Sequence, residues 1–521
     1  MNLLNKLPLV ALLCLSLAVH SQKITFQGLQ NYHHSALTPI YEQHEVKGYM
    51  LYYMADRADR KNNNYVVEVL DENLNKVKSI TITKPKKSYF LVRNAYNGSA
   101  FCFYFYNHRG KSMELETYDR GLNKLATLEV ETSKYDRLII QQEFKSGKLA
   151  DQNTTGGLNL YAVPGKGFVR IGYVGMGKSY QVMMYDDRLK PVWAFAPEKS
   201  KDHELLGITE VNEDYVVGMI LRRPGLFSTK FDFSVAAFDI NTGKKTIDTP
   251  VETNSGEQLA PNLISYDAQK NNFLILGEFY KPDDKPAVDK SLGMFIKRLS
   301  LDGQALSTTT YRWDKDIRAM LPPAALQNVE DKYVNYVHQI LQDAEGNMHL
   351  VAEQYKIAAS GKGIAIKALG GQASAVKGKI GDMLIYSLDP SGTLQNIRLY
   401  EKGETDVSLP PGSGIYGASM LGHLIKGSSG FDYQFAQRDN QQTNFNIAYI
   451  DYNEEAEKAT LVDVIVDDTQ RFSTDRIDIT SSKHSKLHVY PAKIGYNMLV
   501  EFNTKEERLD LRLVKLNKLP L

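Results

Sequence analysis

The sequence contains little cysteine and tryptophan, and its charges nearly balance. Only two of its 521 residues are cysteine, Cys14 and Cys102. Loss of the N-terminal segment would remove Cys14 and exclude an intramolecular disulfide. Cys102 lies in the apolar run FCFYFY, which indicates a buried and unreactive thiol. A formal charge of +1 argues against a nucleic-acid binder, which needs a strong positive field.

Several motifs are also missing. The sequence has no H-E-x-x-H motif, no G-x-S-x-G motif and no phosphate-binding loop, because Gly177-Lys178-Ser179 lacks the upstream glycine. The histidines form no convincing ligand spacing, so we expect no cofactor and no metal site. After the N-terminus no apolar run is long enough to cross a bilayer.

The N-terminus has the organisation of a secretory signal peptide. A lysine at position 6 precedes the apolar stretch 7–19, and Val19-His20-Ser21 suits cleavage before Gln22. The sequence therefore predicts a signal peptide at 1–21 and a mature domain at 22–521 in the periplasm or outside the cell. Lipoprotein anchoring through Cys14 is the alternative, although Leu13 fits such a site poorly.

A repeat extends over the rest of the chain, in units of strands a to d. In each unit a tight turn rich in Gly, Asn or Asp is followed by a seven-residue apolar strand b. Most third strands end in a turn with Asp, at Asp71, Asp119, Asp186, Asp239, Asp302 and Asp389, and more weakly at Asp451. The second strands begin at Tyr49, Phe101, Phe168, Tyr215, Phe273, Met348, Phe431 and Tyr496.

These units predict an all-β fold, a single closed β-propeller with eight four-stranded blades. The last copy has three strands, and 23–27 (KITFQ) supplies a spare strand that would complete it and close the ring. Seven blades, or two β-sandwiches or barrels in series, are the alternatives. Two segments interrupt the pattern: 314–331, with a short helix broken by Pro322-Pro323, and the Gly/Ala/Lys-rich 358–381, expected to be mobile.

Loops between strands b and c share one face of a propeller with the connections between blades, and such loops often bind ligands. These loops are basic here and predict an anionic partner: a glycan, a lipid head group or an envelope protein. Ordinary solvation of surface loops is the alternative. The candidate ligand-binding residues are Arg57, Arg60, Arg109, Arg222, Arg223, Lys281, Lys285 and Lys290.

Glutamate recurs at the sixth position of strand b, as Glu278, Glu353 and Glu501. Paired carboxylates catalyse acid–base chemistry on sugars or bind cations. Structural carboxylates that pair with Lys or Arg of a loop are the alternative. We include the three glutamates among the candidate site residues.

The turn DAEGNMHL at 343–350 resembles the turn signature of NHL-like propellers, although it occurs once. Together with the "LD-x-x-L-N-K" turns, it makes the chain similar to secreted bacterial β-propeller-like proteins of unknown function. The resemblance supplies no catalytic residues. We therefore expect a non-catalytic binding or scaffold protein of the bacterial cell envelope, with its ligand on the b–c loop face. The alternatives are a carbohydrate-active hydrolase or lyase and a surface adhesion or sensory module.

Overall fold

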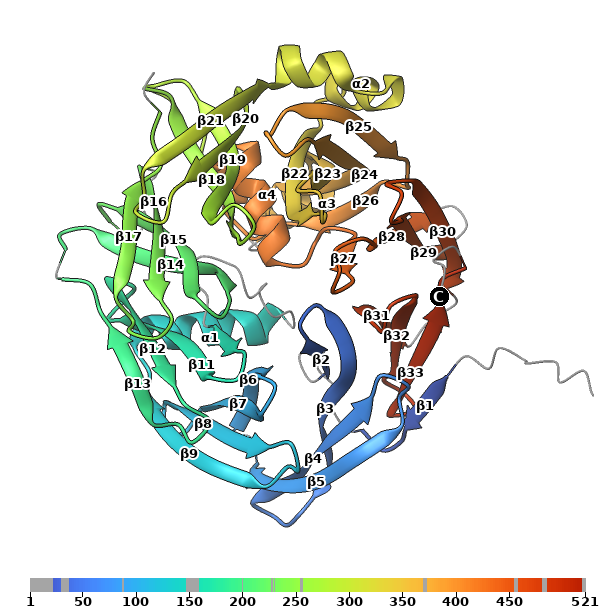
Figure 1. Ribbon diagram of the computed structural model, residues 1–521. Coiled ribbons are helices and arrows are strands. Elements are labelled where there is room, and N and C mark those ends of the chain that lie inside the picture. Colours follow the sequence, from blue (N-terminus) through green and yellow to red (C-terminus); the bar gives the residue numbers. More distant parts are fainter. Residues whose placement is uncertain are drawn as a thin grey trace, which may run out of the picture.

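The computed structural model describes residues 22–29, 37–86, 89–146, 159–198, 200–225, 228, 230–253, 256–368, 373–453, 458–479 and 485–517. The expected signal peptide at 1–21, with Cys14, lies outside these residues. Eight antiparallel sheets surround a central axis, seven with four strands and one with five (Figure 1). The predicted all-β propeller with eight blades is confirmed, and the seven-bladed and two-sandwich alternatives are wrong.

The first four blades use the N-terminal half of the chain. Blade 1 contains β2 (Leu37–Glu42), β3 (Glu45–Arg57), β4 (Asn62–Asp71) and β5 (Lys76–Pro85). Blade 2 contains β6 (Tyr89–Tyr96), β7 (Ala100–Asn107), β8 (Ser112–Asp119) and β9 (Lys124–Glu131). Blade 3 contains β10 (Leu160–Val163), β11 (Gly167–Val174), β12 (Ser179–Tyr185) and β13 (Pro191–Phe195). Blade 4 contains β14 (His203–Val211), β15 (Tyr215–Arg223), β16 (Asp232–Asp239) and β17 (Lys245–Pro250).

The other four blades complete the ring. Blade 5 contains β18 (Gln258–Asp267), β19 (Asn272–Tyr280), β20 (Gly293–Leu299) and β21 (Ala305–Arg312). Blade 6 contains β22 (Val334–Gln342), β23 (Met348–Ala359), β24 (Val376–Leu388) and β25 (Leu394–Tyr400), with β26 (Thr405–Ser408) paired to β24. Blade 7 contains β27 (Tyr433–Arg438), β28 (Phe445–Asn453), β29 (Lys458–Val466) and β30 (Phe472–Ile479). Blade 8 contains β31 (Ser485–Pro491), β32 (Tyr496–Asn503), β33 (Arg508–Lys515) and β1 (Lys23–Phe26).

Packing of the blades explains the apolar runs of the sequence. Each second strand has a neighbouring blade against both of its faces, and every residue of β19 is buried. The outer strand β5 instead has mostly exposed or half-buried residues. Strand b therefore appears in the sequence as a continuous apolar run and not as an alternating pattern.

The N-terminal strand closes the ring as predicted. In β1, Lys23 lies opposite Arg512 and Phe26 opposite Leu509 of β33. Thr25 Oγ1 donates a hydrogen bond to Asp510 Oδ1 at 2.6 Å, and Phe26 is buried in the core. Because β1 pairs with β33, the last strand of the chain is not left with an exposed edge.

Several of the turns between strands share one geometry. An oxygen of the first residue's side chain accepts backbone N–H groups, as Asp186 Oδ1 does from Arg188 (2.9 Å) and Lys190 (2.8 Å). The residue three positions later has a positive φ, 57° at Leu189 and 91° at Gly392. In blade 5 the first residue is Ser300, and the predicted Asp302 lies inside the turn. A buried leucine takes the left-handed conformation in three of these turns, at Leu74, Leu122 and Leu189.

The predicted register of blade 7 is wrong by one strand. The run that begins at Phe431 forms the first strand, β27, and the segment with Asp451 is the second strand, β28. The turn predicted at 426–430 is the end of a helix that precedes the blade. Both ends of the segment 358–381, which is expected to be mobile, belong to the hairpin of β23 and β24, with Ala359 opposite Val376. Residues 369–372 of that segment lie outside the described part.

Short helices lie in the connections. They are α1 (Lys134–Ser146), α2 (Pro323–Glu330), α3 (Gly361–Ala368), α4 (Ala418–Gly427), and the single turns η2 (Trp313–Ile317), η3 (Arg318–Met320) and η4 (Ser413–Ile415). The helix expected near Pro322-Pro323 is α2, which begins at Pro323. Within the described ranges no helix has the length and apolarity needed to span a membrane.

Candidate functional site

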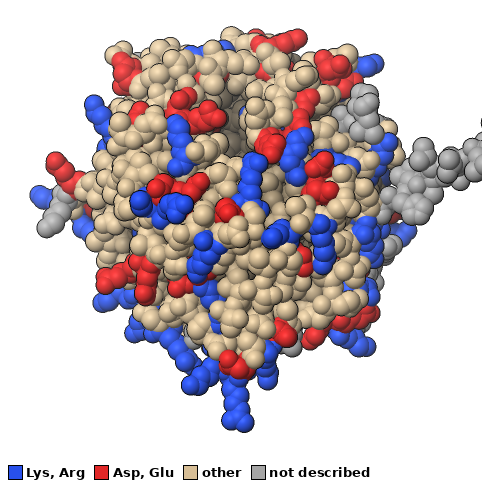
Figure 2. All heavy atoms as spheres, turned by 60° about the horizontal axis from the view of Figure 1, so that its bottom comes forward, with Lys and Arg blue, Asp and Glu red and all other residues tan. Residues whose placement is uncertain are grey.

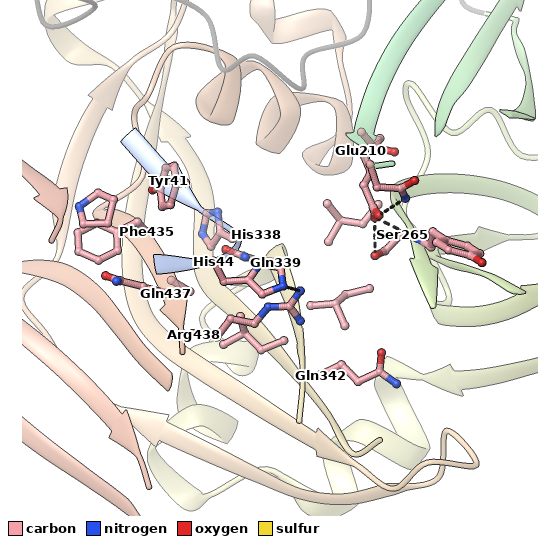
Figure 3. Close-up of a pocket in the computed structure, with 18 of the residues that line it drawn as sticks. Tyr41, His44, Glu210, Ser265, His338, Gln339, Gln342, Phe435, Gln437 and Arg438 are labelled. Carbon is pink, nitrogen blue, oxygen red and sulfur yellow. Dashed lines mark hydrogen bonds between the residues drawn. The ribbon is translucent and has the colours of Figure 1, made fainter. Parts of the chain in front are cut away.

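A cavity of about 1130 Å³ occupies the centre of the ring. Its walls are the inner strands β2, β14, β18, β22, β27 and β31 with the turns that follow several of them, and Lys426 of α4. The lining combines aromatic, amide and charged side chains (Figure 3). None of the described residues in the b–c loops lines this cavity.

Helix α4 lies inside the ring, on the face of the b–c loops (Figure 1). Gly417, which precedes α4, donates its backbone N–H to Ala287 O in the β19–β20 loop at 2.9 Å. Tyr355 Oη donates to Ala418 O at 2.7 Å, and His423 Nε2 lies 3.1 Å from Asn262 Oδ1. These contacts hold α4 against blades 5 and 6, so the cavity lies between α4 and the turns of the opposite face.

Arg438 and His44 meet at the cavity wall (Figure 3). Arg438 is the last residue of β27, and His44 lies in the turn between β2 and β3. Arg438 Nη2 lies 3.0 Å from His44 Nε2. Because arginine can only donate, His44 Nε2 is the acceptor and carries no proton. Burial lowers the pKa of His44, and the charge of Arg438 lowers it further.

Glu210 lies on another wall of the cavity, at the end of β14 (Figure 3). Its Oε2 accepts hydrogen bonds from Ser265 Oγ at 2.8 Å and from the Tyr266 backbone N–H at 3.0 Å. Its Oε1 accepts one from Asn212 Nδ2 at 2.9 Å. These bonds fix the carboxylate between blades 4 and 5.

Amide and aromatic groups fill the rest of the wall. Tyr433 Oη donates to Gln339 Oε1 at 2.6 Å, and Gln437 Nε2 donates to Ala492 O at 2.6 Å. Tyr41 is 43% exposed, and Phe435 is half-buried. Rings of this kind offer apolar contact area, while the amides both donate and accept hydrogen bonds.

Glu353 belongs to a buried charged cluster behind this wall. Its side chain has no exposed area, and it lies 3.3 Å from Lys402 Nζ and 3.2 Å from His338 Nε2. Lys402 Nζ also lies 2.6 Å from Asp432 Oδ2. Burial alone would lower the pKa of Lys402, but the charges of Glu353 and Asp432 raise it. Burial raises the pKa of Glu353 and brings that of Asp432 to about 6.

The other two candidate glutamates also lie away from the cavity lining. Glu278 is buried on β19, where it accepts a hydrogen bond from Tyr280 Oη at 2.7 Å, and burial raises its pKa. Glu501 is half-buried on β32, opposite Asp510 of β33. A substrate could reach Glu278 or Glu353 only after the covering side chains had moved.

The candidate basic residues divide into two groups. Arg222 is bound between Glu204 (3.0 Å) and Asp248 (2.8 Å), and Arg223 is half-buried. The other six are exposed in b–c loops or at their edges: Arg57, Arg60, Arg109, Lys281, Lys285 and Lys290. On the side of the molecule that Figure 2 shows, Lys and Arg side chains are interspersed with Asp and Glu. No group of three or more His, Cys, Asp or Glu in the described ranges is arranged to hold a metal ion.

The sequence reasoning missed the cavity residues Arg438, His44 and Glu210. All three lie at the inner end of a first strand or in the turn after it, which is where a propeller directs residues toward its axis. Position at the end of a first strand could have identified these residues. The wrong register of blade 7, however, placed Arg438 after a second strand. The candidate ligand-binding residues from the sequence lie in the b–c loops and on the second strands, not on the first strands.

Comparison with protein families gives one match. The model of a family described as "Family of unknown function (DUF6770)" matches residues 3–517. The chain belongs to this family. No curated protein matches the DUF6770 chain.

Solved propellers are similar to this DUF6770 protein at low identity. The WD40 domain of SCAP from fission yeast is 9% identical with a TM-score of 0.40, and the match covers 92% of this chain and 97% of that one. Prolyl oligopeptidase B from Galerina marginata is 9% identical with a TM-score of 0.40, over 92% of this chain and 56% of that one. The β-propeller domain of the Trilobed protease from Pyrococcus furiosus is 10% identical with a TM-score of 0.32, over 72% and 96%. The DUF6770 chain thus spans about half of the oligopeptidase.

Proposed function

We propose that this protein is a non-catalytic binding protein of the bacterial cell envelope that holds a ligand in the central cavity. The observation that supports this most is the composition of the cavity wall, where Tyr41, Phe435 and the cation of Arg438 line the same cavity. Rings, amides and a few fixed charges are the elements by which pockets hold and orient small ligands. The N-terminal signal peptide expected from the sequence supports the location.

The state of the glutamates favours binding over hydrolysis. A hydrolase needs two carboxyl groups that reach the same glycosidic bond. Glu353 is bonded to Lys402 and to the backbone N–H groups of Asp432 and Tyr433, each at 3.2 Å, which leaves little capacity for a substrate. Glu278 is bonded to Tyr280. These bonds hold strands together, which is the structural role considered above.

Binding to the mature chain, residues 22–521, tests the proposal. A panel of acidic and neutral oligosaccharides and short peptides is measured by calorimetry, with Tyr41→Ala as the cavity variant. The control is the triple variant Lys281→Gln, Lys285→Gln, Lys290→Gln on the b–c loops. We expect Tyr41→Ala to weaken a bound ligand at least fivefold and the triple variant to leave it unchanged. The reverse pattern would move the ligand to the b–c loop face and reject the cavity.

The b–c loop face supports a second candidate function, attachment to an anionic lipid surface. Seven of the twelve large apolar side chains that are exposed in the described ranges lie on this face or in its connections. Exposed lysines lie in the same loops, and a surface that combines apolar and cationic groups suits anionic lipid. The seven residues are Leu138, Val174, Met176, Val288, Ile364, Ile366 and Ile415.

Co-sedimentation with vesicles tests this second candidate. Vesicles with about one-third phosphatidylglycerol should bring down the mature chain, and vesicles of phosphatidylcholine alone should not. Ile364→Ser with Ile366→Ser in α3 should reduce the bound fraction, whereas Leu306→Ser, an exposed apolar residue of the outer strand β21, should not. Equal sedimentation of all variants would reject attachment through this face.

A further inference from the structure

The guanidinium of Arg438 belongs to a half-buried side chain at the wall of the central cavity. In the described part of the chain its hydrogen-bond partner is His44 Nε2, and no carboxylate lies within ion-pair distance of it. Burial lowers the pKa of Arg438, while the charge of Glu210 acts in the opposite direction. Arginine remains protonated despite such shifts. The cavity therefore contains a positive charge without a bonded counter-ion.

Two other arginines of the fold are neutralised by direct contact with carboxylates, whereas the buried Arg170 donates to Tyr104 Oη at 3.0 Å. Arg298 Nη1 lies 2.9 Å from Asp267 Oδ2 and 3.0 Å from Asn272 Oδ1. Arg222 contacts both Glu204 and Asp248. An unpaired buried charge is costly, so pairing is the rule inside proteins. Arg438, at the wall of the central cavity, has no carboxylate in such contact among the described residues.

A second contact between the two turns fixes His44 beside Arg438. The backbone N–H of His44 donates to Asn440 Oδ1 at 2.9 Å, which ties the β2–β3 turn to the turn after β27. Arg438 donates one N–H group to the imidazole. The remaining N–H groups of its planar guanidinium can donate to a ligand in the cavity. A side chain oriented in this way loses little entropy when it binds an anion.

We infer that Arg438, together with His44, forms a subsite for the carboxylate group of a ligand in the central cavity. This inference rests on the proposed function and gives it a ligand class. A carboxylate matches the guanidinium fork with two parallel hydrogen bonds. Glu210 already places one negative charge whose field reaches Arg438, which disfavours a doubly charged phosphate. Tyr41 and Phe435 would contact the uncharged body of the ligand.

The imidazole makes binding depend on pH. The charged groups around His44 are Arg438, Glu45 of its own hairpin, Asp439 after β27, and Glu210 on the other wall. A bound carboxylate would offset Arg438 and raise the pKa of His44. Protonated His44 would then donate to the ligand and no longer accept from Arg438. Affinity should rise at least threefold from pH 8 to pH 5.5, above the range where the ligand's own carboxyl protonates.

Two kinds of molecule carry a single carboxylate on a neutral body, a uronic acid sugar and a peptide C-terminus. Methyl galacturonide, which has one carboxylate, and N-acetylated tripeptides that end in tyrosine are therefore titrated into residues 22–521, each beside its neutral amide. We expect one series to bind at least tenfold more tightly as the acid than as the amide. The series that binds identifies the source of the carboxylate.

Variants separate the subsite from the cavity as a whole. Arg438→Gln should abolish the preference for acid over amide, and Arg60→Gln on the b–c loops should leave it unchanged. His44→Gln keeps an acceptor for Arg438 but does not titrate, so it should bind at pH 8 and lose the gain at pH 5.5. Binding of acid and amide alike, sensitive to Tyr41→Ala but not to Arg438→Gln, would overturn the subsite and leave the proposed function standing. Failure of every probe to bind would overturn both.

Discussion

Arg438 and His44 are 394 residues apart in the sequence, and Arg438 Nη2 lies 3.0 Å from His44 Nε2. The contact joins blade 7 to blade 1, although blade 8 lies between these blades in the ring. It is possible because the β2–β3 hairpin extends toward the centre of the ring in Figure 1. The cavity wall therefore depends on closure of the ring as well as on the individual blades.

Closure of the ring can be tested at Phe26, which is 3% exposed. Phe26→Ala removes a buried ring from the strand that completes blade 8 and should lower the free energy of unfolding by about 3–5 kcal/mol. Lys23→Ala is the control, since the Lys23 side chain is 50% exposed and its ion pair with Asp510 should contribute at most about 1 kcal/mol. Urea denaturation measures both. Equal, small effects would show that β1 does not close the ring.

The buried cluster around Lys402 predicts a large stability effect. Lys402→Met leaves Glu353 and Asp432 without their cation, and breaking a buried pair in this way costs about 3–5 kcal/mol. Lys379→Met is the matched control, because Lys379 pairs with Glu404 near the surface and should change stability by about 1 kcal/mol or less. If the two variants unfold at the same urea concentration, the cluster has no such role.

Asp463 predicts a specific pH dependence of stability. It accepts hydrogen bonds from Asn497 (2.6 Å) and Asn446 (3.2 Å), and burial raises its pKa to about 6. The unfolded value is about 3.9, so the folded chain binds more protons between pH 4 and 6, and the stability from the protonated carboxyl is lost as pH rises through 6.

Asp463→Asn removes this titration. The free energy of unfolding of the wild type relative to the variant should therefore fall by up to about 3 kcal/mol between pH 4 and pH 7. Denaturation curves across that range measure the difference, with exposed Asp478→Asn as the control. Parallel curves for the wild type and Asp463→Asn would contradict the raised pKa.

The turn between β22 and β23 provides a test of the repeat motif. Asp343 is 1% exposed, and its Oδ1 accepts the backbone N–H groups of Glu345 (2.9 Å) and Asn347 (2.8 Å). Asp343→Ala leaves these donors unsatisfied and should cost about 1–3 kcal/mol, while Asp343→Asn should retain much of the stability. Glu345→Ala should stay within about 0.5 kcal/mol of the wild type. If Asp343→Ala leaves the free energy of unfolding unchanged, these hydrogen bonds do not stabilise the turn.

Much of the fold could be predicted because the repeat follows from packing. Strands such as β19 are buried on both faces and therefore appear as apolar runs, and the spare segment at Lys23 fits the incomplete last blade. The prediction of blade 7 was wrong because α4 is followed by Ser428-Ser429-Gly430, which has the composition of a turn between strands. Leu189 shows another limit, since its positive φ is tolerated where the side chain is buried, and composition alone would favour glycine there.

The site was less predictable than the fold. Sequence spacing located Glu278 and Glu353 on equivalent strands. It could not show that Glu278 accepts a hydrogen bond from Tyr280 and that Glu353 forms an ion pair with Lys402. Arg438 is distinguished by its place in the cavity wall beside His44, without a carboxylate in contact, and this placement is visible only in three dimensions.

A crystal structure of residues 22–521 grown with the tightest-binding carboxylate probe tests the central claim most directly. The account predicts density for the carboxylate against the guanidinium of Arg438, with the body of the ligand beside Tyr41. Density only at Lys281, Lys285 and Lys290 on the b–c loops, with an empty cavity, would contradict it.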